Sequence, residues 1–186
     1  GVQWQGADTI LDADGVPIRW IWKTWAWETA LDQLRQELDE DVQRQLLRQP
    51  LEHEPPRLMD VLLRPSTMVF EPIWTLIPSN KAILPVLWEM FPDHPYLLEA
   101  HFQLTDNLRA KGYVSKPIAG RCGYNISVVN KEHAVLTETS GQFDEQQQIF
   151  QELRALPNIG SHRAQVSTFS AGGVYAGACA RVDSSL

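Results

Sequence analysis

The residues between Gly112 and Asn125 combine one lysine with closely spaced glycines. Lys116 falls in a strand-like run, and Gly120 and Gly123 follow it in a loop before a second strand-like run. Phosphate oxygens bind amide N–H groups at close range; glycines let the backbone approach, and a lysine adds a point charge. The spacing is neither that of the Walker loop nor that of the dinucleotide fingerprint. Residue types alone therefore leave two interpretations, a phosphate-binding loop or a tight hairpin with an exposed lysine.

Three further basic residues stand where they could contact an anion. Lys81 follows Asn80 at an expected helix start, where the first amides of a helix attract negative charge. Arg181 follows the small residues 177–180, which would leave room for a ligand and let the guanidinium stabilise a phosphoryl group in transfer. Arg121 lies inside the glycine loop. The alternatives are an ordinary helix cap beside a solvated lysine, and arginines in salt bridges.

The sequence offers little support for a metal site, a hydrolase triad or a disulfide framework. The five histidines show no spacing typical of metal ligands, and the one serine beside a Gly-Gly pair, Ser170, lacks the nucleophile-elbow pattern. Cys122 and Cys179 are too few for a disulfide framework or a structural zinc site, and they favour a reducing cytoplasm. We therefore expect no metal ligand in this chain and no hydrolase triad.

Size and charge narrow the class of protein. With 186 residues, 44% of them hydrophobic, the chain can bury the core of one domain. The net charge of −7 argues against a general nucleic-acid binder, which needs a basic face. The apolar runs are too short to span a membrane, and no segment has the pattern of a signal peptide.

The elements that must position these residues divide by type along the chain. Apolar residues recur every three or four positions from Trp27 to Leu47, which predicts a helix with Thr24 as its N-cap. A second helix is expected to run to about Phe91, capped by Ser79 or Asn80.

The remainder of the chain is mostly strand-like. Strands are predicted at 112–118, 125–129, 134–138, 164–170 and 173–182. A further helix is predicted at about 144–153. The predicted fold class is α+β, with a helix-rich first half at about 24–110 and a mainly antiparallel sheet at about 111–186.

Five stretches, in order, resemble the glutathionylspermidine synthetase family, a group of ATP-grasp ligases. They begin IWKTWAWETALDQLR at 21–35, LMDVLLRPSTMVFEPIW at 58–98, GYVSKPIAGRCGYNISVV at 112–129, SGQFDEQQQIFQELRALP at 140–157 and QVSTFSAGGVYAGACARVDSSL at 165–186. They cover most of the chain, which makes the resemblance more specific than any single motif. It implies an ATP-grasp-like fold.

The resemblance implies a nucleotide site built from named positions. Lys81 and Lys116 correspond to the two lysines that contact nucleotide phosphates. The loop that folds over the triphosphate corresponds to Gly120, Cys122, Gly123 and Tyr124. The segment 150–153 corresponds to the adenine border, with Gln151 as the expected polar contact and Leu153 beside it.

It also implies catalytic and substrate contacts. Arg181 corresponds to the arginine that steadies the transferring phosphoryl group, and Arg121 and Thr29 to contacts with glutathione. In the family, ATP and Mg²⁺ activate the glycine carboxylate of glutathione as an acyl phosphate, which an amine of spermidine or a related amine then attacks. A homodimer stays open, and no nucleic acid or membrane partner is expected.

Some family features lie outside the chain. The acidic Mg²⁺ ligands of the family would precede residue 20, and the final strand region would follow residue 186. The chain is therefore expected to be the C-terminal part of a synthetase, cut at both ends, that works with the rest of its parent polypeptide and is inactive alone. The alternative is a non-catalytic interaction domain that keeps the fold.

Overall fold

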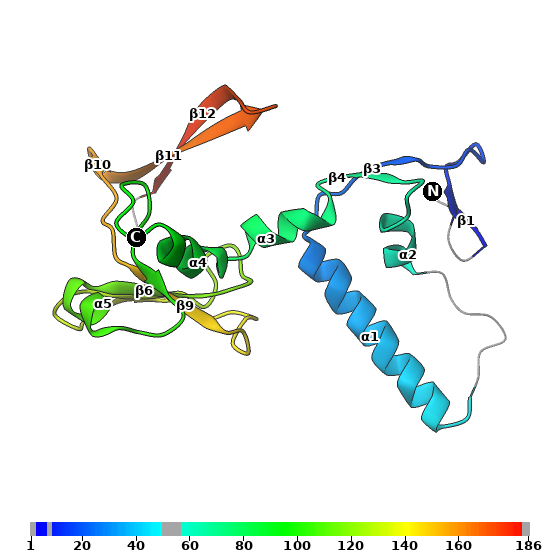
Figure 1. The fold of residues 1–186 in the computed structure, drawn as a ribbon, viewed down its shortest axis with the longest axis horizontal. Helices are drawn as coiled ribbons and strands as arrows, with labels where there is room; N and C mark the ends of the chain where they lie inside the picture. The colour runs from blue at the N-terminus through cyan, green and yellow to red at the C-terminus, as the bar shows by residue number, and fades with distance from the viewer. Residues whose placement is uncertain (1–2, 7–8, 50–56, 184–186) are drawn as a thin grey trace. The chain divides into compact units, whose positions relative to one another are not determined.

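The structure, a computed structural model, describes residues 3–6, 9–49 and 57–183 (Figure 1). The chain forms two compact units, Gly1–Ser79 and Asn80–Leu186, which we describe separately. Both contain helices and strands, and most strand pairs are antiparallel, so the predicted mixture of helix and antiparallel sheet is confirmed. No helix in the described ranges is long and apolar enough to cross a membrane.

The first unit contains one long helix and several short elements. Its helices are α1 (Trp27–Leu46), α2 (Leu58–Leu62), a 3-10 turn (Ile73–Thr75) and α3 (Leu76–Ser79). Its strands are β1 (Gln3–Gln5), β2 (Thr9–Leu11), β3 (Trp20–Trp22) and β4 (Met68–Phe70). β1 pairs with β2 in antiparallel fashion, whereas β3 and β4 are parallel.

Helix α1 confirms the helix predicted from the apolar spacing, but the predicted Thr24 cap is wrong. The N-cap is Ala26, which makes no side-chain capping bond. Before it, Lys23 is buried and its Nζ donates to the carbonyl of Trp25 at 3.0 Å, and Ala26 has an extended backbone. Trp27 then turns into the core, where its ring lies 4.9 Å below the Lys23 ammonium.

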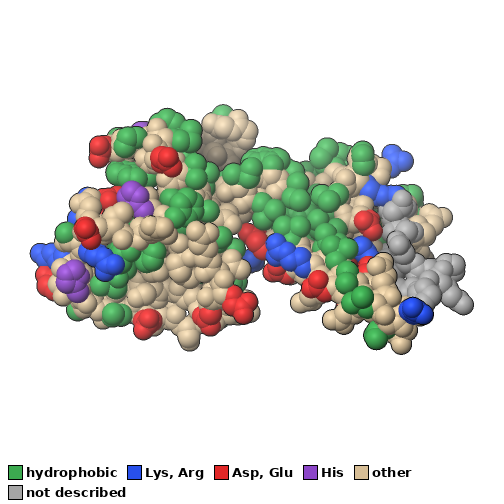
Figure 2. Space-filling view, turned by 60° about the horizontal axis from the view of Figure 1, so that its bottom comes forward, with side chains coloured by type: hydrophobic (Ala, Val, Ile, Leu, Met, Phe, Trp, Pro, Cys, Tyr) green, Lys and Arg blue, Asp and Glu red, His purple; other side chains and the backbone are tan. Residues whose placement is uncertain are grey.

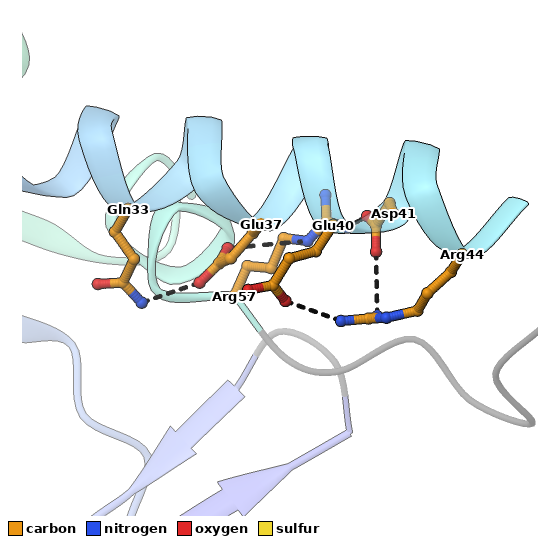
Figure 3. A network of polar contacts seen from close by, with 6 residues as sticks. All are labelled: Gln33, Glu37, Glu40, Asp41, Arg44 and Arg57. Atoms are coloured by element: carbon orange, nitrogen blue, oxygen red, sulfur yellow. Dashed lines mark hydrogen bonds and ion pairs between the residues drawn. The ribbon is translucent and has the colours of Figure 1, made fainter. Parts of the chain in front are cut away.

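The polar side of α1 carries a chain of ion pairs (Figure 3). Arg44 contacts Glu40 at 2.9 Å and Asp41 at 3.3 Å, one turn back along the helix. Arg57, which precedes α2, also binds Asp41 and lies 3.9 Å from Glu37. These contacts fix the start of α2 against the side of α1.

The β3–β4 ribbon has one face in the core and one exposed face. Val69 is buried in a cluster with residues of α1 and α2, and Ile21 packs against that cluster. The residues between them in the alternation are exposed: Trp20, Trp22, Met68 and Phe70. The rings of Trp20 and Phe70 stack at 6.1 Å, and Figure 2 shows hydrophobic side chains at the surface of this unit.

The second unit holds two sheets. Its helices are α4 (Ile83–Met90) and α5 (Asp106–Lys111). Five strands form one antiparallel sheet in the order β5 (Ala100–His101), β9 (Gln148–Glu152), β6 (Tyr113–Pro117), β7 (Ser127–Val129) and β8 (Val135–Glu138). The other sheet orders β10 (Asn158–Ile159), β11 (His162–Ala171) and β12 (Val174–Asp183).

The strand predictions for this unit are confirmed, and one helix prediction is wrong. Strands β6, β7, β8, β11 and β12 match the predicted ranges within two residues at either end. The predicted helix at 144–153 is instead a turn followed by β9. Ile149 and Gln151 are buried while their neighbours are partly exposed, a period of two that fits a strand between β5 and β6.

Candidate functional site

Strands β6 and β9 bring two of the predicted contact residues together. Their antiparallel register places Val114 opposite Gln151 and Lys116 opposite Ile149. Since side chains alternate along a strand, Lys116 and Gln151 project from the same face. The Lys116 ammonium donates a hydrogen bond of 2.8 Å to Oε1 of Gln151. The pairing thus joins a lysine predicted for phosphate contact to the polar residue predicted for adenine contact.

Lys81 reaches the loop that follows β6. Its backbone amide donates to the carbonyl of Ile118 at 2.8 Å, and its Nζ donates to the carbonyl of Gly120 at 2.6 Å. The side chain of Asn80 accepts a hydrogen bond from the amide of Ala82 at 2.8 Å, although α4 itself begins at Ile83, later than predicted. The segment before α4 is therefore tied to the glycine loop.

The two lysines form a positively charged pair in a partly desolvated setting. Burial lowers the pKa of the Lys116 ammonium below its ordinary value, and the positive charge of Lys81 lowers it further. Both effects disfavour the charge in the absence of an anion. A phosphate group between the two ammonium groups would relieve both, so the arrangement favours an anionic ligand.

The loop 120–124 has a backbone that glycine largely dictates. A Cβ at Gly120 would lie 2.7 Å from Cγ of Pro117. Gly123 has φ of +75°, and Cys122 adopts φ of +56°, a left-handed conformation that is rare for cysteine. Cys122 and Tyr124 are exposed, and the Tyr124 ring lies 6.5 Å from that of Phe143.

The end of β9 is held by its own backbone contacts. Gln151 is buried, with 8% of its surface exposed. The amide of Glu152 donates to the carbonyl of Glu99 at 2.8 Å, and the amide of Leu153 donates to that of Gly112 at 3.0 Å. The Leu153 amide is thus already engaged, and a nucleotide contact at Leu153 would use its other atoms.

A buried carboxylate, which no sequence pattern indicates, supports this strand end. Glu99, 5% exposed, accepts hydrogen bonds from Asn107 at 2.6 Å and Lys111 at 2.9 Å, and contacts His101 at 3.2 Å. Burial raises the pKa of Glu99, but the hydrogen bonds from Lys111, Asn107 and His101 together hold it below its ordinary value. The bond to Glu99 raises the pKa of Lys111.

Arg181 lies on the other sheet of the second unit. It is exposed on β12, directly opposite Gln165 of β11. The next pair on the same face is Ser167 and Cys179, so small side chains border the guanidinium as predicted from the run 177–180. Gln165 was not singled out from the sequence; only the strand register shows that it faces Arg181.

The two residues predicted to contact glutathione belong to different units. Arg121 is exposed in the glycine loop, beside Gly120. Thr29 is exposed in the first turn of α1, in the first unit. Hydrogen bonds join Lys81 to Gly120 and Lys116 to Gln151, and the amide of Tyr124 donates to the carbonyl of Arg121 at 3.2 Å.

The described residues do not supply a metal centre. Within 3–6, 9–49 and 57–183, no group of three or more His, Cys, Asp or Glu side chains is placed to hold a metal ion. The positive charges of Lys116 and Lys81 suit a phosphate group and would repel a metal ion.

Comparison with known proteins gives the chain a family. The family model described as glutathionylspermidine synthase preATP-grasp matches residues 1–186. The chain belongs to the glutathionylspermidine synthase family. It is 49% identical over 183 residues to the bifunctional glutathionylspermidine synthetase/amidase of Escherichia coli strain K12, a match that covers 98% of this chain and 30% of that protein.

More distant family members also match. The trypanothione synthetase of Crithidia fasciculata is 38% identical over 179 residues, covering 95% of this chain and 27% of that protein. A putative acid–amine ligase of Haemophilus influenzae is 40% identical over 73 residues, covering 38% of this chain and 18% of that protein. The chain spans only about 30% of the length of the Escherichia coli relative. These proteins are named as ligases, so the chain belongs to a ligase family.

Proposed function

We propose that this chain forms the nucleotide-binding part of an ATP-dependent carbon–nitrogen ligase with an ATP-grasp-like fold. The observation that carries the proposal is the lysine pair: Lys116 on β6 and Lys81 before α4 are close enough to lower the pKa of Lys116, and Lys81 is bonded to the Gly120 carbonyl. Two ammonium groups beside a glycine loop suit a triphosphate. The named relatives support the ligase class.

The proposed reaction joins a carboxylate to an amine. The carboxylate oxygen takes the γ-phosphoryl group of ATP and releases ADP. The amine nitrogen then attacks the acyl carbon, phosphate leaves, and the amine loses a proton. Glutathione and spermidine, or a related amine, are the proposed substrates because a similar protein is named glutathionylspermidine synthetase.

The predicted site residues have proposed roles in this reaction. Lys81 and Lys116 bind phosphate oxygens, and the loop from Gly120 to Tyr124 covers them and excludes water that would hydrolyse the acyl phosphate. Gln151 contacts the adenine. Arg181 stabilises charge on the phosphoryl group in transfer.

Other contacts are proposed beyond the phosphates. Arg121 and Thr29 would contact glutathione. Among the described residues no group of three or more His, Cys, Asp or Glu side chains could hold a metal ion, so the Mg²⁺ ligands are proposed to lie outside this chain, and no step here depends on them. A cytoplasmic location, a homodimer and a position toward the C-terminal end of a synthetase stay predictions.

Nucleotide binding tests the proposal. In a thermal-shift titration with ATP and Mg²⁺, ligand at about 100 times its dissociation constant should stabilise a binding-competent protein by about 2.7 kcal/mol. The complete natural polypeptide that contains these residues is the sample, because the chain spans only part of its relatives. Lys116→Ala should abolish most of the shift.

A matched control variant distinguishes loss of the phosphate site from the general effect of removing a surface lysine. Lys131 is an exposed lysine with a long 3.8 Å contact to Glu132, and Lys131→Ala should keep the wild-type shift. Equal curves for wild type and Lys116→Ala would refute the phosphate role and leave an interaction domain as the better account. Turnover of ATP by the 186-residue chain alone would contradict the expectation that it needs the rest of the protein.

A further inference from the structure

We propose that Thr139 and Asn125 are positioning residues that hold the loop 120–124 in the conformation that receives the triphosphate. This inference rests on the proposed nucleotide site. Neither residue was singled out from the sequence. Thr139 follows β8 and contacts the end of the loop, and Asn125 is the residue directly after the loop. Neither is assigned a contact with phosphate.

The hydroxyl of Thr139 joins both sides of the loop's end. Oγ1 donates to the carbonyl of Gly123 at 2.6 Å and accepts a hydrogen bond from the amide of Ile126 at 2.9 Å. The Thr139 amide also donates to the Ile126 carbonyl at 2.9 Å. One side chain therefore fixes the orientation of the Gly123 peptide, and with it the direction of the amide that follows.

The side chain of Asn125 makes a second link. Asn125 has φ of +56°, a left-handed conformation that asparagine tolerates better than most residues. Its Oδ1 accepts a hydrogen bond from the amide of Phe143 at 3.0 Å, and its Nδ2 donates to a carboxylate oxygen of Asp144. The end of the loop is thus tied to the turn that leads into β9.

The backbone at Gly141 is packed too closely against the loop to accommodate a Cβ atom. A Cβ at Gly141 would lie 2.5 Å from Cβ of Tyr124 and 2.6 Å from Oδ1 of Asn125. The segment around Gly141 therefore lies against the end of the loop, next to the side chain of Asn125. The Thr139 hydroxyl, the Asn125 side chain and this close packing together hold one loop conformation.

This arrangement matters because a glycine loop otherwise samples many conformations. Ordering it during binding would weaken affinity for the nucleotide, whereas a loop ordered beforehand does not incur that loss. The expected effect of losing one such hydrogen bond is therefore a weaker apparent affinity for ATP, by about threefold to tenfold, with the chemical step less affected.

Thr139→Val tests the inference, since valine keeps the shape and removes the hydroxyl. In the complete ligase, Thr139→Val should raise the KM for ATP about threefold to tenfold and leave kcat within about twofold. Thr139→Ser, which keeps the hydroxyl, should restore the wild-type KM. Thr137→Val, a valine substitution two residues earlier on β8, should have the KM of wild type.

The outcomes distinguish a positioning role from a purely structural one. A wild-type KM for ATP in Thr139→Val would overturn the inference, even if the melting temperature without ligand fell. If Thr139→Val does not fold, Asn125→Gly takes its place, because glycine adopts the left-handed backbone without strain, while the loss of the side-chain bonds and the added backbone freedom both loosen the end of the loop. Asn125→Gly should raise the KM for ATP in the same way, and an unchanged KM would also overturn the inference.

Lys116→Ala, measured alongside, separates this inference from the proposed function. If Lys116→Ala binds ATP normally, the nucleotide site is wrong and the positioning role fails with it. If Lys116→Ala loses ATP binding while Thr139→Val and Asn125→Gly keep it, the nucleotide site stands and only the positioning role is refuted.

Discussion

The buried carboxylate of Glu99 should contribute measurably to the stability of the second unit. Glu99→Gln removes its charge while keeping its shape. The amide oxygen of glutamine can still accept from Asn107 and Lys111, and its NH₂ group would face His101. The loss is then mainly that of charge assistance, which we expect to lower the free energy of unfolding by about 1–2 kcal/mol.

Glu99→Ala should be more damaging, because it leaves the three partners without their acceptor. Removing one member of a buried ion pair typically costs about 3–5 kcal/mol. The Glu99 side chain is only 6% exposed, but that of Lys111 is 45% exposed and can turn to water, so we expect about 3 kcal/mol, the lower end of that range.

The contribution of Glu99 to folding stability should depend on pH in a definite direction. Because the pKa of Glu99 is lowered in the folded protein, its contribution is present above its unfolded pKa and is lost as the pH falls through the folded value. The difference in stability between wild type and Glu99→Gln should therefore shrink under acidic conditions. On the alkaline side, the contribution of Lys111, whose pKa is raised, is lost as the pH rises through its folded value.

Urea unfolding followed by circular dichroism gives these free energies. Hydrogen exchange of peptides that cover β6 and β9 assigns the transition to the second unit. The control is Glu132→Gln, which removes a surface carboxylate 3.8 Å from exposed Lys131 and should leave stability unchanged. The reasoning fails if Glu99→Gln is as stable as this control, or if its difference from wild type is the same at neutral and acidic pH.

Three further changes have expected outcomes. Gly120→Ala should destabilise the second unit by about 1–3 kcal/mol, because its Cβ would meet the Pro117 ring at 2.7 Å; unchanged urea unfolding would count against this packing. ATP affinity measured by calorimetry should fall as the pH rises through the lowered pKa of Lys116, and Lys116→Arg should remove that dependence; a flat wild-type profile would contradict it. Thr105→Ala should cost about 1 kcal/mol, because Thr105 caps α5 by accepting from the Leu108 amide at 3.2 Å, whereas Thr105→Ser should not.

Periodic patterns predicted the elements of this chain well. The apolar spacing that begins at Trp27 is a local property, and α1 follows it over its full length. The strand that contains Lys116 and the strand after the glycine loop were also predicted, since both hold valines bounded by glycine-containing segments. The segment 144–153 failed because its glutamines and glutamates favour a helix in isolation, while burial of Ile149 between two strands overrides that preference.

The site was predicted as residue types, and its geometry came from the pairing of strands. That Lys116 meets Gln151 depends on the register of β6 with β9, which no local pattern specifies. The Glu99 cluster joins residues of β5 and α5 that share no common spacing, and Thr139 reaches Gly123 across a hairpin. Such contacts carry no periodic signal, so only the folded chain reveals them.

The lowered pKa of Lys116 gives its amine a chemical property of its own. An amine attacks carbonyl compounds and activated esters only in its unprotonated form, and Lys116 holds more of that form than an ordinary lysine at the same pH. Its side chain is only partly buried, so small electrophiles can reach it. The residue proposed to bind a triphosphate should thus also be more readily acylated in the empty protein than an ordinary lysine, and a bound polyanion, by restoring the proton, would lower that reactivity.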